Sequence, residues 1–133
     1  MRAGRHVVFS LYAHLVFVSK YRKKIFNKQM LDLLSQTFSD TCKKFDAELV
    51  EFEGESDHVH LLINYPPKVA LSKLVNSLKG VSSRLLRITF KQHIAKYYWK
   101  NVFWSPSYFV GSCGGAPLNV IKQYIQNQQV PYT

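Results

Sequence analysis

Two histidines, His58 and His60, are separated by one apolar residue in a run with the composition of a β-strand. Successive side chains of a strand point to opposite faces of the sheet, so both imidazoles should project from one face, about 6–7 Å apart along the strand. Such a pair can supply two nitrogen ligands to a divalent metal ion, but two nitrogens do not complete a coordination sphere. Another part of the chain would have to supply more.

A tyrosine and a glutamine, Tyr124 and Gln128, are four residues apart in a helix expected over residues 117–128, where they lie one above the other on the same side. Alone, the pair is more simply interpreted as a helix surface partly packed on the core. Together with His58 and His60 it suggests a reaction. A metal bound by the two imidazoles and the Gln128 amide oxygen would polarise a phosphodiester, and the Tyr124 hydroxyl would attack phosphorus.

The charge of the chain indicates the kind of partner. Eighteen Lys and Arg against eight Asp and Glu give a formal net charge of +10 over 133 residues, which favours nucleic acid ahead of an anionic membrane. The sequence has no signal-peptide pattern and no apolar run of about 18 residues, so we expect one soluble cytoplasmic domain with no membrane contact. Cys42 and Cys113 form no Cys-x-x-Cys pair and are expected to be small apolar side chains.

Cations cluster in two places. The first cluster surrounds a tyrosine just after the expected first strand, which suits either phosphate and base contact or a simple solvated run. The second is a stripe of three cations at i, i+3 and i+7 on an expected helix, followed at residues 96–100 by aromatic rings interleaved with lysines, which suits unpaired nucleic acid. The positions that we assign to DNA binding are Lys20, Tyr21, Arg22, Lys23, Lys79, Arg84, Arg87 and Lys91.

Strand and helix patterns alternate along the first half of the chain. Residues 7–18 are rich in β-branched and aromatic side chains and predict a long first strand, in which His14 is more simply a packed or hydrogen-bonded histidine than a ligand. Apolar residues at spacings of three and four predict a helix over 28–44, capped by Asn27. A second strand over 48–52 then leads into the histidine strand.

The second half repeats the pattern. A helix is expected from residue 70 to 88, with Gly80 as a point where it could be interrupted. A strand over 102–110 contains Pro106, which places it at a sheet edge or a bulge. Three glycines within residues 111–116 predict a pliable linker to the last helix.

With these motifs the chain resembles a known family, the single-tyrosine HUH transposases of small insertion sequences (the IS200-like type). HUH denotes His-hydrophobic-His, which is met here by His58, Val59 and His60. No single block is decisive, but five blocks occur in the family's order and cover nearly the whole chain. They are residues 14–22, 57–62, 78–84, 103–109, and 114–118 leading to 124–128.

The resemblance implies an α+β fold, a ferredoxin-like or RRM-like antiparallel sheet packed by helices, within residues 1–110, followed by the linker and a mobile helix. It implies that Tyr124 is the nucleophile, that His58, His60 and Gln128 hold Mg²⁺ or Mn²⁺, and that single-stranded DNA is cleaved to a 5′-phosphotyrosine and a free 3′-hydroxyl. It also implies a homodimer that binds hairpins at the element's ends, with the tyrosine helix of one subunit completing the site of the other.

Three alternatives remain open from the sequence. A domesticated HUH hairpin nickase would use the same chemistry for its host without moving an element. A non-catalytic RRM-like nucleic-acid-binding module would leave the spacing of Tyr124 and Gln128 without a purpose. A metallohydrolase that activates water would leave Tyr124 idle, and no carboxylate bridge or further histidine cluster supports it. The role of Asp57 beside the histidines is also open.

Overall fold

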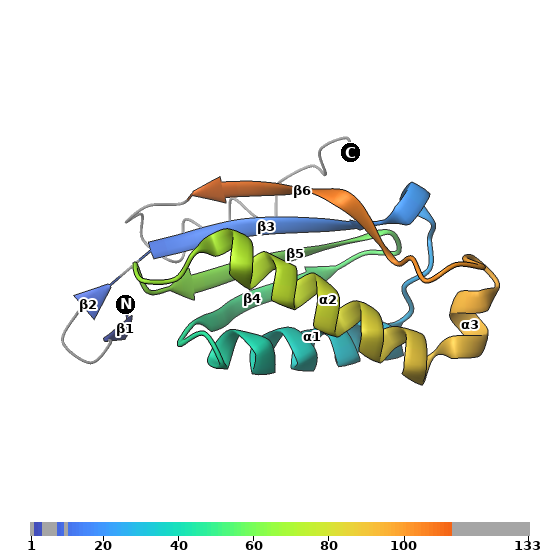
Figure 1. Cartoon of the computed structure of the whole chain (residues 1–133), viewed down its shortest axis with the longest axis horizontal. Helices are drawn as coiled ribbons and strands as arrows, with labels where there is room; N and C mark the ends of the chain where they lie inside the picture. Colours follow the sequence, from blue (N-terminus) through green and yellow to red (C-terminus); the bar gives the residue numbers. More distant parts are fainter. Residues whose placement is uncertain (1, 4–7, 10, 113–133) are drawn as a thin grey trace.

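A computed structural model describes residues 2–3, 8–9 and 11–112 of the chain (Figure 1). These residues form an antiparallel sheet of four strands in the order β4-β5-β3-β6, with α1 and α2 side by side on one of its faces. The strands are β3 (Leu11–Ser19), β4 (Glu48–Gly54), β5 (His58–Tyr65) and β6 (Trp104–Ser112). The helices are α1 (Lys28–Lys43), α2 (Leu71–Thr89), the short α3 (Lys91–Ala95) and the 3-10 turn η1 (Lys20–Arg22).

The main sheet confirms the predicted ferredoxin-like arrangement. Its elements follow the chain order strand, helix, strand, strand, helix, strand, and the first and third of these strands lie at its centre. Both central strands, β3 and β5, are therefore hydrogen-bonded on two sides. A side chain placed on β5 consequently stands on a rigid support.

The core lies between this sheet and the two long helices. From the sheet it takes the alternate residues Leu15, Phe17, Val59, Leu61 and Ile63, which all point toward the helices. The helix α1 begins as predicted, because the Asn27 side-chain oxygen accepts a hydrogen bond from the Met30 N–H at 2.9 Å. Its apolar stripe of Met30, Leu34, Phe38 and Cys42 is fully buried against the sheet, which confirms Cys42 as an apolar core residue.

Two predictions for the strands and linker need correction. The strand expected over 7–18 is divided, since β2 (Val8–Phe9) pairs with β1 (Arg2–Ala3) in a separate small sheet and the central strand begins at Leu11. Gly111 and Ser112, which were expected to open the linker, belong to β6 instead, because this strand continues through Ser112 and Gly111 lies opposite His14 in the ladder. Backbone pairing with β3 overrides the preference of glycine for a loop.

The edge strand behaves as expected. Pro106 lies within β6, whose second side has no partner strand among the described residues, so its missing N–H costs no ladder hydrogen bond. The register between β3 and β6 shifts between Phe17 and Ser19, which is the irregularity that a proline predicts. Cys113 and the expected C-terminal helix lie outside the described residues.

The second helix also differs from the expectation in two respects. It is continuous through Gly80, because Leu78 and Ser82 on either side are buried and hold the turn in place. It ends at Thr89, so Lys91 belongs to α3 and does not continue the stripe of Arg84 and Arg87 along one helix. Among the described residues, none of the helices is long and apolar enough to span a bilayer.

Candidate metal centre and nucleic-acid surface

The two histidines lie at the start of β5, one of the two central strands of the sheet. His58 and His60 lie on the face opposite to Val59 and Leu61, which are part of the helix-facing core, as predicted from the strand period. Their ring centroids are 5.1 Å apart, and both side chains are buried, with exposed fractions of 8% and 6%. The structure therefore brings the two proposed nitrogen ligands together.

His60 is held by a third histidine on the neighbouring strand. His14 of β3 is fully buried, and its Nε2 lies 2.9 Å from Nδ1 of His60, with the two rings stacked at a centroid distance of 5.2 Å. This confirms the prediction of a hydrogen-bonded histidine within the sheet. Because His60 uses Nδ1 for this bond, its Nε2 is the nitrogen left for a metal.

Burial keeps these imidazoles neutral. It lowers the pKa of His14 to about 4. For His60, burial and then electrostatic repulsion from the neighbouring imidazoles of His14 and His58 lower the pKa to about 4. A neutral imidazole is the form that binds a metal, so no proton has to be displaced from His60 at neutral pH.

His58 is oriented by a carboxylate. Its Nδ1 donates to Oδ1 of Asp57 at 2.7 Å, and the other oxygen of Asp57 accepts from Nε of Arg22 at 3.3 Å. Burial raises the pKa of the Asp57 carboxyl, but the hydrogen bond from His58 and the charge of Arg22 outweigh it and hold this pKa below its ordinary value. The carboxylate is thus ionised, and it leaves Nε2 of His58 for a metal, as carboxylates do beside many metal-binding histidines.

The turn η1 delivers Arg22 to this carboxylate. Tyr21 and Arg22 have positive φ angles of 61° and 52°, a left-handed conformation that is uncommon for residues other than glycine. The turn is fixed by backbone bonds from Ser19 N–H to the Asp57 carbonyl at 3.0 Å and from Lys20 N–H to the Phe103 carbonyl at 2.8 Å. Backbone strain of this kind is characteristic of functional sites.

Two oriented Nε2 atoms on one strand fit part of the coordination sphere of a divalent metal. Within residues 11–112 and the short segments before them, no group of three or more His, Cys, Asp or Glu side chains is placed to hold an ion by itself. The predicted third ligand, Gln128, and the predicted nucleophile, Tyr124, lie outside the described residues. The structure places His58 and His60 together, and their assignment with Gln128 as metal ligands stays a prediction.

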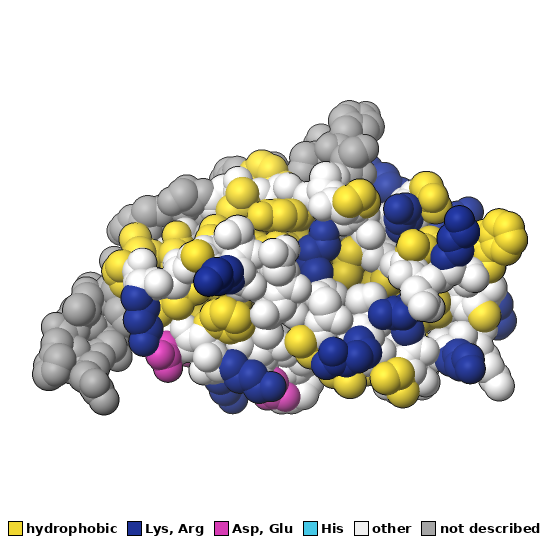
Figure 2. All heavy atoms as spheres, viewed as in Figure 1, with side chains coloured by type: hydrophobic (Ala, Val, Ile, Leu, Met, Phe, Trp, Pro, Cys, Tyr) yellow, Lys and Arg dark blue, Asp and Glu magenta, His cyan; other side chains and the backbone are white. Residues whose placement is uncertain are grey.

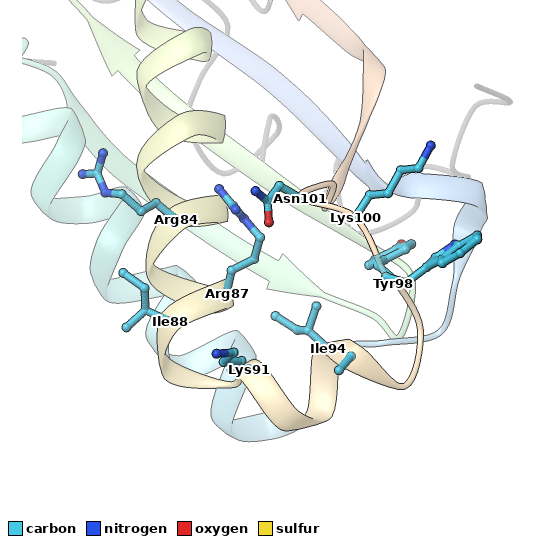
Figure 3. Close-up of a pocket in the computed structure, with 10 residues that line it drawn as sticks. Arg84, Arg87, Ile88, Lys91, Ile94, Tyr98, Lys100 and Asn101 are labelled. Carbon is cyan, nitrogen blue, oxygen red and sulfur yellow. The ribbon is translucent and has the colours of Figure 1, made fainter.

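The basic positions divide into two groups. Arg84, Arg87 and Lys91 line a cavity of about 580 Å³ between α2, α3 and the segment leading to β6 (Figure 3). In the space-filling view, Lys and Arg gather over this end of the molecule while Asp and Glu are sparse (Figure 2). Tyr21 and Lys23 are exposed on and beside η1.

Other predicted contacts already have partners in the fold. Arg22 is paired with Asp57. The Lys79 ammonium donates to the backbone carbonyls of Ser105 and Pro106 at 2.7 and 3.4 Å, and burial lowers its pKa. Lys20 places its ammonium 5.5 Å from the centroid of the Tyr21 ring. A role of Lys79 or Arg22 in DNA binding stays a prediction, and their visible role is to tie elements together.

Sequence reasoning missed the partners of the histidines and part of the cavity. His14 is 46 residues from His60, and Arg22 is 35 residues from Asp57, so neither contact has a local signal. Trp99 and Lys100, which also line the cavity, carried a signal in the interleaved rings and cations of residues 96–100 but were not assigned.

Comparison with known proteins gives a consistent result. A family model described as "Transposase IS200 like" matches residues 7–128. The ISDra2 transposase TnpA of Deinococcus radiodurans is 30% identical over 128 residues, which cover 96% of this chain and 91% of that protein. The transposase for insertion sequence element IS200 of Salmonella typhimurium is 30% identical over 123 residues, with 92% and 80% covered.

Two solved structures of transposases are also similar to this chain. A crystal structure of a protein from Deinococcus radiodurans described as a transposase is 33% identical, covers 98% of this chain and all (100%) of that one, and superposes with a TM-score of 0.75. A REP-associated tyrosine transposase bound to a REP hairpin is 12% identical and superposes with a TM-score of 0.60, covering 94% of this chain and 68% of that one. The second likeness concerns the fold alone.

Proposed function

Because the chain belongs to the family of IS200-like transposases, we propose that it cleaves and rejoins single-stranded DNA at the ends of an insertion sequence, with Tyr124 as the nucleophile. The observation that carries the proposal is the pair His58 and His60. Both imidazoles are buried on one face of a central strand, and each has its Nδ1 engaged so that Nε2 is left for a metal.

The site residues have separate roles in this reaction. His58, His60 and Gln128 hold a divalent ion, Mg²⁺ or Mn²⁺. When bound, this ion supplies positive charge that polarises the scissile phosphodiester and offsets charge on its oxygens. Asp57 and His14 keep the two imidazoles in the orientation that binding requires.

Tyr124 carries out the covalent step. Its oxygen forms a bond to phosphorus while the bond from phosphorus to the 3′-oxygen breaks. The phenol loses its proton, and the departing 3′-oxygen gains one to become a hydroxyl. The product is a 5′-phosphotyrosine. A free 3′-hydroxyl attacks this phosphotyrosine in the reverse step, so rejoining needs no high-energy cofactor.

The partner is single-stranded DNA with hairpins at the element's ends. The net charge of +10 and the basic end of the molecule support an anionic partner, and a transposase of the same fold has been solved with a hairpin. We also propose that the protein acts as a homodimer in which the Tyr124 helix of one subunit completes the histidine site of the other.

A covalent adduct tests the proposal. The protein is incubated with labelled hairpin-bearing single-stranded DNA from the flanks of its own gene, with Mg²⁺ or with EDTA, and separated on a denaturing gel. We expect a protein–DNA adduct that needs the metal and is lost in Tyr124→Phe. The matched control is Tyr132→Phe, a tyrosine eight residues further along the chain, which should keep the adduct.

The same experiment separates the alternatives. Tight hairpin binding without any adduct in Mg²⁺ or Mn²⁺ would contradict the proposal and favour a non-catalytic binding module. An adduct that persists in EDTA would remove the metal from the reaction. An adduct that Tyr124→Phe retains would assign the nucleophile to another residue.

A further inference from the structure

The cavity between α2 and α3 has the charge and size of a nucleotide site. Its volume of about 580 Å³ falls in the range of roughly 300–1,000 Å³ that small-ligand pockets occupy. Of the described residues that line it, none is acidic and four are cations, Arg84, Arg87, Lys91 and Lys100. Figure 3 shows Arg87 and Asn101 pointing toward each other across the hollow, while Arg84 extends away from it.

A solvent-exposed aromatic side chain lies beside these cations. Trp99 is 95% exposed, and Ile88, another residue of the lining, is 69% exposed. Such large apolar side chains in water gain free energy when a ligand covers them. An indole next to lysines and arginines is the combination that binds single-stranded nucleic acid, because every base can stack on a ring while the cations follow the phosphates.

The shape favours an unpaired strand over a duplex. A duplex is read by a helix or a β-ribbon that protrudes into its groove, whereas this surface is hollow. The face of a base becomes available to Trp99 only when the base leaves its stack. The cavity therefore matches a splayed nucleotide and not a paired stem.

A series of contacts connects the cavity to the histidine site. The Tyr98 hydroxyl, in the cavity wall, donates to the carbonyl of Lys20 at 2.5 Å. Lys20 belongs to η1, whose Arg22 is bonded to Asp57, the partner of His58. On this turn Tyr21 is 76% exposed. In Figure 1, η1, α3 and the start of β5 lie at the same end of the molecule.

We infer that the cavity binds unpaired nucleotides that flank the cleavage site, with one base stacked on Trp99 and phosphates held by Arg87, Lys91 and Lys100. The strand passes over Tyr21 between the cavity and the histidine site. This assignment rests on the proposed function for the identity of the strand, and it separates the part of the surface that holds single strand from any part that holds a hairpin stem.

Binding without chemistry tests the assignment. The full-length protein is titrated in EDTA at low salt, by fluorescence anisotropy, against a labelled run of roughly a dozen thymidines and, separately, a fully paired hairpin without an overhang. Trp99→Leu should weaken single-strand binding by at least about fivefold, because stacking is lost, and should leave hairpin binding unchanged. Trp99→Phe, which keeps a ring, should restore most of the affinity.

Cation variants sharpen the result. Arg87→Gln should lower the slope of log affinity against log salt for the single strand by about 0.7, the value for one phosphate contact. Lys43→Gln is the matched control, since Lys43 is an exposed lysine in the last turn of α1 and should leave the slope unchanged. Equal losses for Trp99→Leu and Trp99→Phe, or equal losses for single strand and hairpin, would overturn the assignment.

The adduct experiment keeps the two proposals apart. If the wild-type protein forms the Tyr124 adduct but Trp99→Leu binds the single strand normally, the assignment of the cavity is wrong and the proposed function stands. If Trp99→Leu loses single-strand binding but the wild-type protein forms no adduct, the cavity is a single-strand site and the proposed function is wrong.

Discussion

The histidine site and the basic cavity are built in opposite ways. At the histidine site the three imidazoles are buried, Asp57 and Arg22 are partly buried, and each side chain is bonded to another: His14 to His60, Asp57 to His58, and Arg22 to Asp57. At the cavity Trp99 is almost fully exposed, and Arg84, Lys91 and Lys100 are exposed as well. The side chains of the first region are fixed by the sheet, and those of the second are open to solvent.

The difference fits the two roles that we propose for these regions. Holding a metal requires donor atoms in one geometry, so ordering the imidazoles within the fold spares that cost at the moment of binding. Holding a strand of variable sequence requires charge and a stacking surface, neither of which needs a fixed rotamer. Substitutions should therefore affect chemistry at the first region and affinity at the second.

The largest effect is expected from His58→Ala. Removing one of the two proposed imidazole ligands should lower metal-dependent cleavage by a factor on the order of a thousand or more, measured as the initial rate of adduct formation. Single-strand binding in EDTA should stay at the wild-type value, because the cavity is separate. A matching loss of single-strand binding, with an unchanged thermal melt, would show that the two regions act as one.

Lowering the pH should destabilise the folded protein, because the buried histidines His14 and His60 resist protonation. Burial holds the pKa values of His14 and His60 at about 4 in the folded protein, below the ordinary 6.5. The unfolded chain therefore takes up protons first as the pH falls, so the free energy of unfolding is highest above pH 6.5 and declines toward pH 4, by about 3 kcal/mol for one imidazole.

Urea denaturation of the metal-free protein measures this decline. His14→Phe keeps a ring at the buried position but removes one titrating group, so its stability should fall less steeply over the same pH range. A wild-type stability that stays constant between pH 6.5 and 4 would mean that water solvates both imidazoles in the folded protein. This result would contradict the description of the histidine site as buried and rigid.

A smaller effect is expected from Asp57→Asn. The amide cannot keep both the bond from His58 and the ion pair with Arg22, so His58 should lose its fixed orientation, with a loss of about 10- to 100-fold in metal affinity. Isothermal titration with Mn²⁺ measures this affinity directly. Asp46→Asn is the control, because Asp46 also pairs with a cation, Lys68, but on an exposed surface. Equal affinities in both variants would show that Asp57 does not orient the ligand.

Much of the fold was predictable because its signals are local. The helix cap at Asn27, the apolar stripe of α1 and the alternation along β5 each lie within a few residues, and the structure confirms all three. The first strand was predicted too long, since the composition of Val8 and Phe9 suits a strand but does not say which sheet they join. Pairing partners of this kind are a tertiary property.

The candidate site was predictable only in part. The spacing of His58 and His60 is visible in the sequence, and so is their common face. The partner of each imidazole is not, because His14 and Arg22 reach the site only through strand pairing and an unusual turn. The interleaved residues 96–100 suggested a nucleic-acid surface, but only the structure shows that Trp99 and Lys100 line one cavity with Arg87 and Lys91.

The smallest effect is expected from Gly80→Ala. This variant tests whether ligand binding at the basic cavity depends on bending of α2. Gly80 is exposed in the interior of α2, and an added Cβ would meet no atom within 4 Å. Alanine should therefore raise the free energy of unfolding by about 0.5–1 kcal/mol, through the lower entropy of the unfolded chain and better helix propensity.

Single-strand binding by Gly80→Ala should equal that of the wild type, since the adaptable part of the cavity is its side chains. Gly54→Ala is the contrasting control, because its Cβ would collide with the Leu31 side chain and should bring no gain in stability. A stabilised Gly80→Ala protein that binds single strands more weakly would show that α2 bends at Gly80 when DNA enters. In that case the openness of the cavity would be a property of the backbone, and the contrast with the histidine site would extend from side chains to the helix itself.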